Sequence, residues 1–329
     1  MPRHERLHYR GAFHIVTLKG RGDATLFYDP RLLPRLSQAH ADAIPSIRLF
    51  FSLLESNTEQ HGCRVHGYCV CPNRTLLIVQ TLGAPLTWVM RPLCGQLSQR
   101  LHALGLAPSG AAFGSRFESR ILAPELLPHA VRRAHVLPVL TGLVKHRIDY
   151  PFSSDRTYQG EPGPSWLTTE DVLRFLQLRG RSGLRGYRQF MDEPEKPYIT
   201  KFFTRGSRWD PRIVGDRDFV ENVHDFVERL PPLPDREQLV LAVATLIGQT
   251  PQHIYSSARA GAFGRALVAA HATRLGVATL GEVGRWFSVT GNALRYGIQR
   301  HKRLRPELFD PPQGELAADS PLLILRGVS

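Results

Sequence analysis

The first part of the chain alternates short runs with a strand pattern and longer runs with helical periodicity. Strand patterns fall at residues 12–18, 63–71, 75–81 and 116–122, and helical ones at about 30–61, 85–104 and 124–144. Strands that alternate with helices over this length predict an α+β domain with one sheet.

The pattern changes twice further along the chain. From Tyr150 to Pro211 the sequence is rich in Pro, Gly, Ser and Arg, with a helical pattern only at 167–177, so we interpret this part as a connecting region. Beyond Asp216 all patterns are helical, at 219–230, 235–247, 250–257, 264–275, 280–287 and 291–304. We therefore expect an α+β domain at 1–155, a connecting region at 156–213, a helical domain at 214–310 and a tail at 311–329.

The last two predicted helices form a recognisable pair. Thr279 and Glu282 have the spacing of a capping box, which starts a helix at Leu280. After a tight turn at 288–289, Thr290 is an N-cap for the second helix. Leu294 and Ile298 form the inner face of that helix, and its outer face is polar. Two helices joined in this way predict a helix-turn-helix motif.

Charge points to a polyanionic partner. The chain has 42 Lys and Arg against 29 Asp and Glu, a net charge of +13. Between residues 264 and 306, Glu282 is the one acid against eight basic residues, at 265, 274, 285, 295, 300, 302, 303 and 305. A helical bundle with a merely solvated basic face is the alternative, but the steep asymmetry favours duplex DNA binding. The candidate contacts are Asn292, Arg295, Gln299, Lys302 and Arg303.

Other features of the sequence limit where in the cell the protein is expected. No apolar run approaches the ~18–20 residues that a membrane span needs. The charged start of the chain excludes a signal peptide, and the four cysteines are typical of reduced thiols. We expect no membrane partner and a cytoplasmic protein associated with the bacterial nucleoid.

Residues 265–300, RALVAAHATRLGVATLGEVGRWFSVTGNALRYGIQR, resemble the DNA-binding domain of the bacterial replication initiator DnaA. The order of helix, Leu-x-Glu-x-Gly-x-x-Phe, turn and helix matches without a gap. Residues 289–293, Val-Thr-Gly-Asn-Ala, stand where that family carries the polar run that recognises its own site. The resemblance therefore implies a DNA-binding domain, but not recognition of the initiator's site.

The first 155 residues resemble the REP-associated tyrosine transposases, a single-tyrosine branch of the HUH nucleases. The matching motifs are RLHYRGA at 6–12, Val16-Thr17, RVHGYC at 64–69 before Pro72-Asn73, FGSRF at 113–117, Pro138-Val139, Gly142-Leu-Val144 and YPFSS at 150–154. The resemblance implies a ferredoxin-like antiparallel sheet with helices on one face. It also implies hairpin or single-stranded DNA as substrate, a homodimer, and an initiator-like domain at the C-terminus.

That family cleaves DNA with four residues that this chain lacks. Two histidines in a His-x-His pattern share a face of a strand and hold Mg²⁺ or Mn²⁺. A helix supplies the nucleophilic tyrosine and, one turn later, a further ligand. Here the matching positions are Arg74, Leu76, Arg133 and Leu137. Since a guanidinium stays protonated, it cannot attack phosphate. We therefore expect no catalytic residue, no metal and no cofactor.

Arginine at former catalytic positions can instead hold a phosphate, so Arg74 and Arg133 are candidate DNA contacts of the first domain. Arg116, in the FGSRF motif, is a further candidate. Cys69 and Cys71 share a strand face as soft metal ligands would, but we interpret them as core residues. His61 and His66 are not predicted to share a face, and we interpret His135, which lies near the former tyrosine position, as a capped or surface residue. Tyr68 and Tyr150 belong to the structural motif of the family.

The hypothesis from sequence is a transposase-like DNA-binding protein that has lost its activity. One alternative is an active transposase whose site is rearranged or is completed by a partner. The other is a role in RNA binding or protein interaction.

Overall fold

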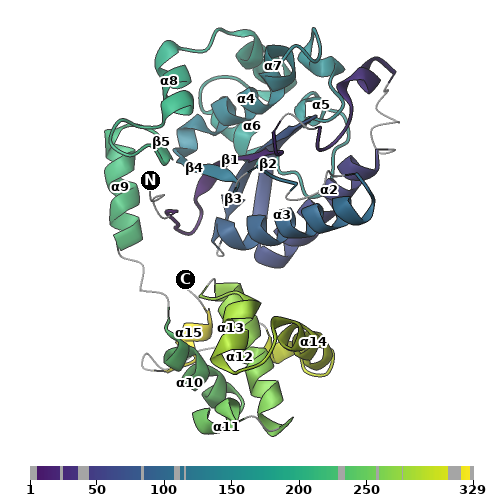
Figure 1. The fold of residues 1–329 in the computed structure, drawn as a ribbon. Helices are drawn as coiled ribbons and strands as arrows, with labels where there is room; N and C mark the ends of the chain where they lie inside the picture. The colour runs from purple at the N-terminus through teal and green to yellow at the C-terminus, as the bar shows by residue number, and fades with distance from the viewer. Residues whose placement is uncertain are drawn as a thin grey trace. The chain divides into compact units, whose positions relative to one another are not determined.

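The computed structural model forms two compact units, Met1–Val227 and Glu228–Ser329 (Figure 1). It describes residues 6–22, 25–35, 44–82, 85–106, 112–114, 116–228, 234–256, 259–275, 277–309 and 320–326. The helical pattern expected at 36–43 lies outside these residues. The division differs from the predicted one, because residues 156–213, expected as a linker, and residues 214–227, expected in the helical domain, are part of the first unit.

The first unit contains a sheet of five strands in the order β2-β3-β1-β4-β5. The strands are β1 (Phe13–Lys19), β2 (Cys63–Cys71), β3 (Arg74–Thr81), β4 (Glu118–Leu122) and β5 (Ile213–Val214). All neighbours pair antiparallel except β4 and β5, which are parallel. The α+β class is confirmed. The expectation of a purely antiparallel sheet is wrong, because Ile213 and Val214, at the predicted border between the connecting region and the helical domain, form a parallel edge strand.

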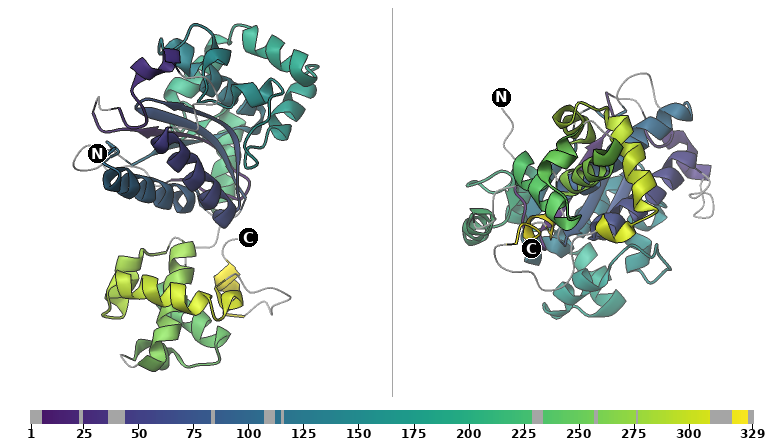
Figure 2. Two further views of the ribbon diagram at one scale, coloured as in Figure 1. Left: turned by 90° about the vertical axis from the view of Figure 1, so that its right-hand side faces the viewer. Right: turned by 90° about the horizontal axis from the view of Figure 1, so that it is seen from below.

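Helices cover both faces of this sheet. α2 (Pro45–His61) and α3 (Leu86–Ala103) join the first four strands in the β-α-β-β-α-β connectivity of ferredoxin-like motifs. The Tyr68 ring lies 5.1 Å from the Phe51 ring of α2. A Cβ on the preceding residue, Gly67, would lie 3.1 Å from Val131 of α4 (Leu127–Leu140). Because consecutive strand residues point to opposite faces, α4 lies on the face away from α2, and the one-face expectation is wrong (Figures 1 and 2).

The region expected to connect the domains completes the first core. It forms α5 (Asp155–Tyr158), α6 (Glu170–Gln177), α7 (Gly183–Asp192) and α8 (Pro197–Arg205). Of these, α6 matches the one helix predicted here. Val172, Tyr187 and Phe203 are buried in the same core cluster as the strands. Next, α9 (Arg217–Glu228) packs Val220 and Val223 against β4 and β5.

The second unit is helical, as the pattern predicts. Its α-helices are α10 (Arg236–Leu246), α11 (Pro251–Tyr255), α12 (Ala262–Leu275), α13 (Leu280–Trp286), α14 (Gly291–Lys302) and α15 (Leu323–Arg326). Short 3₁₀ helices occur in both units. Those of the first unit are Pro30–Arg35, Pro124–Leu126 and Arg147–Asp149, and those of the second are Arg259–Gly261 and Pro306–Leu308. The described end of the predicted tail joins the bundle, because Leu325 is buried and its carbonyl accepts from Arg274. No helix in the described ranges is long and apolar enough to span a membrane.

Candidate nucleic-acid interface

The α13–turn–α14 motif is built by local hydrogen bonds at the start of each helix. Thr279 Oγ1 accepts from the Glu282 N–H at 3.3 Å, and Glu282 Oε2 accepts from the Thr279 N–H at 2.7 Å. Thr290 Oγ1 accepts from the Ala293 N–H at 3.1 Å. The capping box and the N-cap of the sequence prediction are therefore confirmed. A Cβ on Gly284 would lie 2.5 Å from the Val289 carbonyl oxygen, so glycine is what lets the turn pass so close to α13.

The outer face of α14 is exposed and cationic. Leu294 is buried beneath it, while all five candidate contacts, Asn292, Arg295, Gln299, Lys302 and Arg303, are exposed. Arg295, Lys302 and Arg303 make no ion pair with any residue that the structure describes. Tyr296, which the sequence analysis did not single out, is 70% exposed beside Arg295.

Two of the eight basic residues counted along this segment serve the fold instead. Arg265 is buried and donates to the carbonyls of Ile254 and Ser256. Arg274 donates to the carbonyl of Leu325. Arg285 is exposed and lies 4.0 Å from the Glu282 carboxylate. The other exposed positive charge of this segment lies on α14 and the residues after it, at Arg295, Arg300, Lys302, Arg303 and Arg305.

In the first unit, the four positions that the resemblance matches to catalytic residues, Arg74, Leu76, Arg133 and Leu137, lie on the sheet face that α4 covers and on α4 itself. Leu76 pairs with Cys69 and Arg74 with Cys71 across β2 and β3. Ile78, two residues beyond Leu76 and so on its face, pairs with Gly67, the residue that α4 contacts. Arg74 is exposed at the start of β3.

These positions do not fit a divalent metal. Leu76 and Leu137 have hydrocarbon side chains, and the Arg74 guanidinium repels a cation. In the described part of the chain, no group of three His, Cys, Asp or Glu side chains lies close enough to hold an ion. Cys69 and Cys71 lie in the core, with their sulfurs 3.7 Å apart.

Arg133, at the position of the family's nucleophile, already has an anionic partner. Its Nη2 lies 2.5 Å from Glu195 Oε2, and its guanidinium lies 4.6 Å from the centre of the Phe203 ring of α8. Thr200 Oγ1 donates to the same Glu195 oxygen at 2.6 Å. A carboxylate therefore occupies the place that a bound phosphate would take. Arg116 is exposed on the segment before β4.

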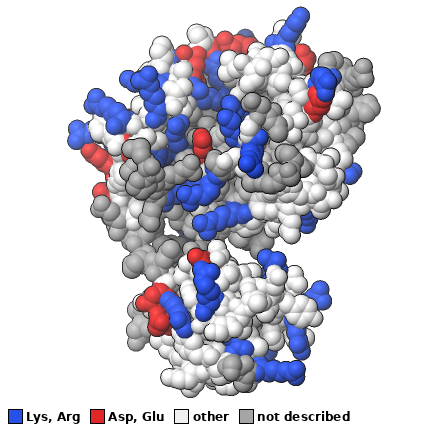
Figure 3. All heavy atoms as spheres, in the orientation of Figure 1, with Lys and Arg blue, Asp and Glu red and all other residues white. Residues whose placement is uncertain are grey.

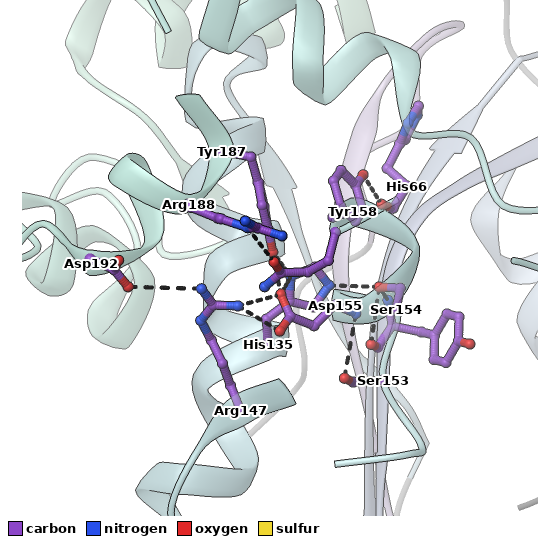
Figure 4. A network of polar contacts seen from close by, with 12 residues as sticks. His66, His135, Arg147, Ser153, Ser154, Asp155, Tyr158, Tyr187, Arg188 and Asp192 are labelled. Carbon is purple, nitrogen blue, oxygen red and sulfur yellow. Dashed lines mark hydrogen bonds and ion pairs between the residues drawn. The ribbon is translucent and has the colours of Figure 1, made fainter. Parts of the chain in front are cut away.

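Behind α4 lies a buried chain of hydrogen bonds that joins four elements (Figure 4). His135 Nδ1 lies 2.6 Å from the Tyr187 hydroxyl, which donates to Asp155 Oδ1 at 2.5 Å. His135 Nε2 lies 2.7 Å from Ser154 Oγ. Since the Tyr187 proton goes to Asp155, Nδ1 carries the imidazole proton and Nε2 accepts from Ser154. Arg147 Nη1 donates to both oxygens of Asp155, at 2.9 and 2.6 Å.

This chain has the residue types of a hydrolytic triad but not the access. Ser154, His135 and Asp155 are all fully buried, and Ser154 Oγ also accepts from the Tyr68 N–H at 2.9 Å. Burial lowers the pKa of His135 to about 4, so the ring is neutral at pH 7. The interpretation of His135 as a capped or surface residue is therefore wrong. The YPFSS motif, which ends at Ser154, was the one signal in the sequence for this network.

Comparisons with known proteins add one likeness. No family model matches the chain, and no curated protein matches it. A solved structure described as a REP-associated tyrosine transposase bound to a REP hairpin is 19% identical, with a TM-score of 0.38. The match covers 51% of this chain and 92% of that chain. At this TM-score the likeness is a distant one.

Proposed function

We propose that this protein is a transposase-like DNA-binding protein that binds DNA without cleaving it. The observation that carries the proposal is the outer face of α14, where Arg295, Lys302 and Arg303 are exposed, without ion pairs to described residues, on the second helix of a helix-turn-helix motif. That arrangement is typical of a helix that enters the major groove of duplex DNA.

The position of each side chain along α14 suggests what it does. Asn292 and Arg295 lie in the first turns, and their donors and acceptors suit base edges. Gln299 continues the same face, while Lys302 and Arg303 at the end of the helix suit phosphates. In the first unit, Arg74 and Arg116 are the proposed contacts to hairpin or single-stranded DNA. We do not retain Arg133, because Glu195 already neutralises its charge.

Absence of cleavage follows from the side chains at the four former catalytic positions. Two leucines and two arginines supply neither a metal ligand nor a nucleophile. The expected result is that hairpin DNA incubated with the protein and Mg²⁺ or Mn²⁺ yields no nicked product and no covalent phosphotyrosyl adduct on a denaturing gel. A metal-dependent adduct would restore the active-transposase alternative.

Duplex binding is tested by two variants of α14. A preferred duplex would first be selected from a random library with the full chain. Arg295→Ala should weaken binding to it by ~1–3 kcal/mol and reduce discrimination against other sequences. Lys302→Ala should weaken all duplexes similarly and lower the slope of log affinity against log salt by about one.

The control is Arg217→Ala in α9. It also removes one positive charge, but a charge that is already paired with Glu221, at 2.7 Å. Losses of equal size from Arg295→Ala, Lys302→Ala and Arg217→Ala would mean that only net charge matters, and the recognition-helix assignment would be abandoned.

A further inference from the structure

A second exposed set of cations and aromatic rings lies in the first unit, on α8 and the turn after it. It consists of Tyr198, Lys201, Arg205, Arg208 and Trp209, which we call the α8 surface. Tyr198 is 56% exposed and Trp209 is 44% exposed. Tyr198, Lys201 and Arg205 have the i, i+3, i+7 spacing of one helical stripe. Figure 3 shows Lys and Arg side chains gathered where Figure 1 places α8.

The acidic and the basic side chains between residues 193 and 210 differ in whether they are paired. All three acids form ion pairs, Glu193 with Arg181, Glu195 with Arg133 and Asp210 with Arg212. Lys201, Arg205 and Arg208 form no ion pair with a described residue. The outer side of α8 therefore carries positive charge that the fold does not use.

The two exposed rings are placed to receive flat partners. Proteins that bind single strands combine aromatic rings that stack on bases with cations that contact the backbone, and the α8 surface presents both. The Arg208 guanidinium lies 4.2 Å from the centre of the Trp209 ring, so a cation already covers part of that ring. Tyr198 packs its edge against Phe202, with the ring centres 6.2 Å apart, and remains largely in solvent.

α8 is held firmly against the sheet. Ile199 and Phe203 are buried beneath it. Arg120 of β4 donates to the carbonyl of Phe203 at 2.7 Å and to that of Thr204 at 3.4 Å, which satisfies carbonyls at the end of the helix. The backbone of α8 is therefore a fixed support for Tyr198, Lys201 and Arg205, and binding does not have to order it.

We infer that the α8 surface binds single-stranded DNA, with Tyr198 and Trp209 stacking on bases and Lys201, Arg205 and Arg208 contacting phosphates. This inference rests on the proposed function. It assigns single-strand binding to residues of the region that was expected to connect the two domains. Unpaired bases are the partner that fits, because each base has an aromatic face that a ring can stack on, whereas duplex bases are already stacked.

The test measures binding of the full chain to a labelled thymidine 30-mer and to a duplex of the same length by fluorescence anisotropy. The double variant Tyr198→Ala/Trp209→Ala should lose about tenfold or more in affinity for the single strand and little for the duplex. Phe226→Ala, which removes a ring that is 54% exposed on α9, should leave single-strand affinity unchanged.

A second pair of variants separates the surface from net charge. Arg205→Ala should weaken single-strand binding several-fold, while Arg217→Ala, with the same net charge, should not. Trp209 fluorescence should be quenched by the thymidine strand, a signal that Trp209→Phe removes. Since all these side chains are exposed, the melting temperature should not change.

The outcomes distinguish the two proposals. If the wild-type chain binds no DNA at low salt, the proposed function fails. If it binds the single strand and the double variant binds equally well, the α8 surface is wrong while the proposed function stands. Tighter binding of a uridine 30-mer than of the thymidine strand would overturn the assignment to DNA.

Discussion

His135 shows how one buried polar residue can join segments that are distant in the sequence. Its two ring nitrogens reach Ser154, at the end of the YPFSS motif, and Tyr187 of α7. Tyr187 passes the chain to Asp155, whose charge is balanced by Arg147. Each donor in this network has an acceptor, so burying the complete network costs little free energy. Removing one member leaves its partner buried without a hydrogen bond and costs more.

Tyr187→Phe should lower the free energy of unfolding by ~1–3 kcal/mol, because it leaves the His135 N–H without its acceptor and Asp155 without one donor. Urea denaturation followed by circular dichroism measures this loss. Tyr198→Phe is the matched control, since the Tyr198 ring is largely exposed and should cost nothing measurable. Equal stability of the two variants would show that the network does not hold α7 in place.

The same network predicts how stability depends on pH. Burial holds the pKa of His135 near 4, below its ordinary 6.5. As the pH falls below 6.5, His135 binds a proton in the unfolded chain but stays neutral in the folded chain. The free energy of unfolding is therefore highest above pH 6.5 and decreases progressively toward pH 4. The expected loss from His135 alone is about 3 kcal/mol. Burial also lowers the pKa of His14 to about 3 and that of His129 to about 4, and both act in the same direction.

His135→Gln isolates the share of His135. Glutamine keeps an acceptor for Ser154 but does not titrate, so the variant should be less stable at neutral pH and should lose less stability on acidification. Urea midpoints measured between about pH 7.5 and pH 4.5 give both slopes. Parallel curves for the variant and the wild type would show that His135 is not the titrating group.

At the scale of single elements, α13 offers a matched pair of glycines. A Cβ on Gly284 would lie 2.5 Å from the Val289 carbonyl oxygen, whereas a Cβ on Gly281 finds its nearest neighbour at 4.0 Å. Gly284→Ala should therefore displace the turn, lower stability and weaken duplex binding. Gly281→Ala should raise stability by ~0.5–1 kcal/mol and leave binding unchanged.

Thermal melting and duplex anisotropy of the two glycine variants decide this prediction. Both substitutions add one methyl group to the same helix, so helix propensity is matched and the contact with the turn differs. If Gly284→Ala binds duplex DNA as well as the wild type does, the close approach of turn and helix is not required for binding.

Elements whose boundaries are set by local chemistry could be predicted from the sequence. α13 and α14 begin at Thr279 and Thr290 because each threonine caps its helix, and the strands β2 and β3 flank the turn at Pro72-Asn73. β5 could not be predicted, since two residues carry no periodicity and Ile213 is a strand only because it pairs with Ile121. Similarly, α7 and α8 are short, and tertiary contacts of Tyr187 and Phe203 fix them in the core.

The candidate site follows the same division. The exposed polar face of α14 could be predicted, because helical periodicity places Asn292, Arg295 and Gln299 together once the helix is given. The partner of Arg133 could not be predicted, since Glu195 is distant in sequence and only the fold brings it within 2.5 Å. The α8 surface was missed although Ile199 and Phe203 have the i, i+4 spacing of an amphipathic helix, because this helix is short and lies in a region rich in Pro, Gly and Arg.

At the scale of the whole molecule, the end of the first unit is the feature in which the structure differs most from the sequence prediction. Residues after Ser154 supply a strand, α6 to α9 and the buried side chains of Tyr187, Phe190 and Phe203. Much of the apolar cover for α4 therefore comes from the part of the chain that composition alone assigns to a linker. Burial of this kind is the main favourable term in folding, at about 25 cal/mol for each Å² of apolar surface.

Two truncated chains test this boundary. A fragment that ends at Val227 keeps every element of the first unit and should unfold in one cooperative transition. It should also keep the single-strand affinity of the full chain, because it contains the α8 surface, and lose the preference for particular duplexes that α14 confers. A fragment that ends at Ser154 leaves α4 without α6 and α7 and removes Asp155 and Tyr187, so His135 would keep Ser154 but lose the acceptor of its Nδ1–H. We expect it to be largely unfolded, with no cooperative urea transition by circular dichroism. A cooperative transition in the shorter fragment, with stability close to that of the longer one, would show that residues 156–227 are an appendage to a complete domain.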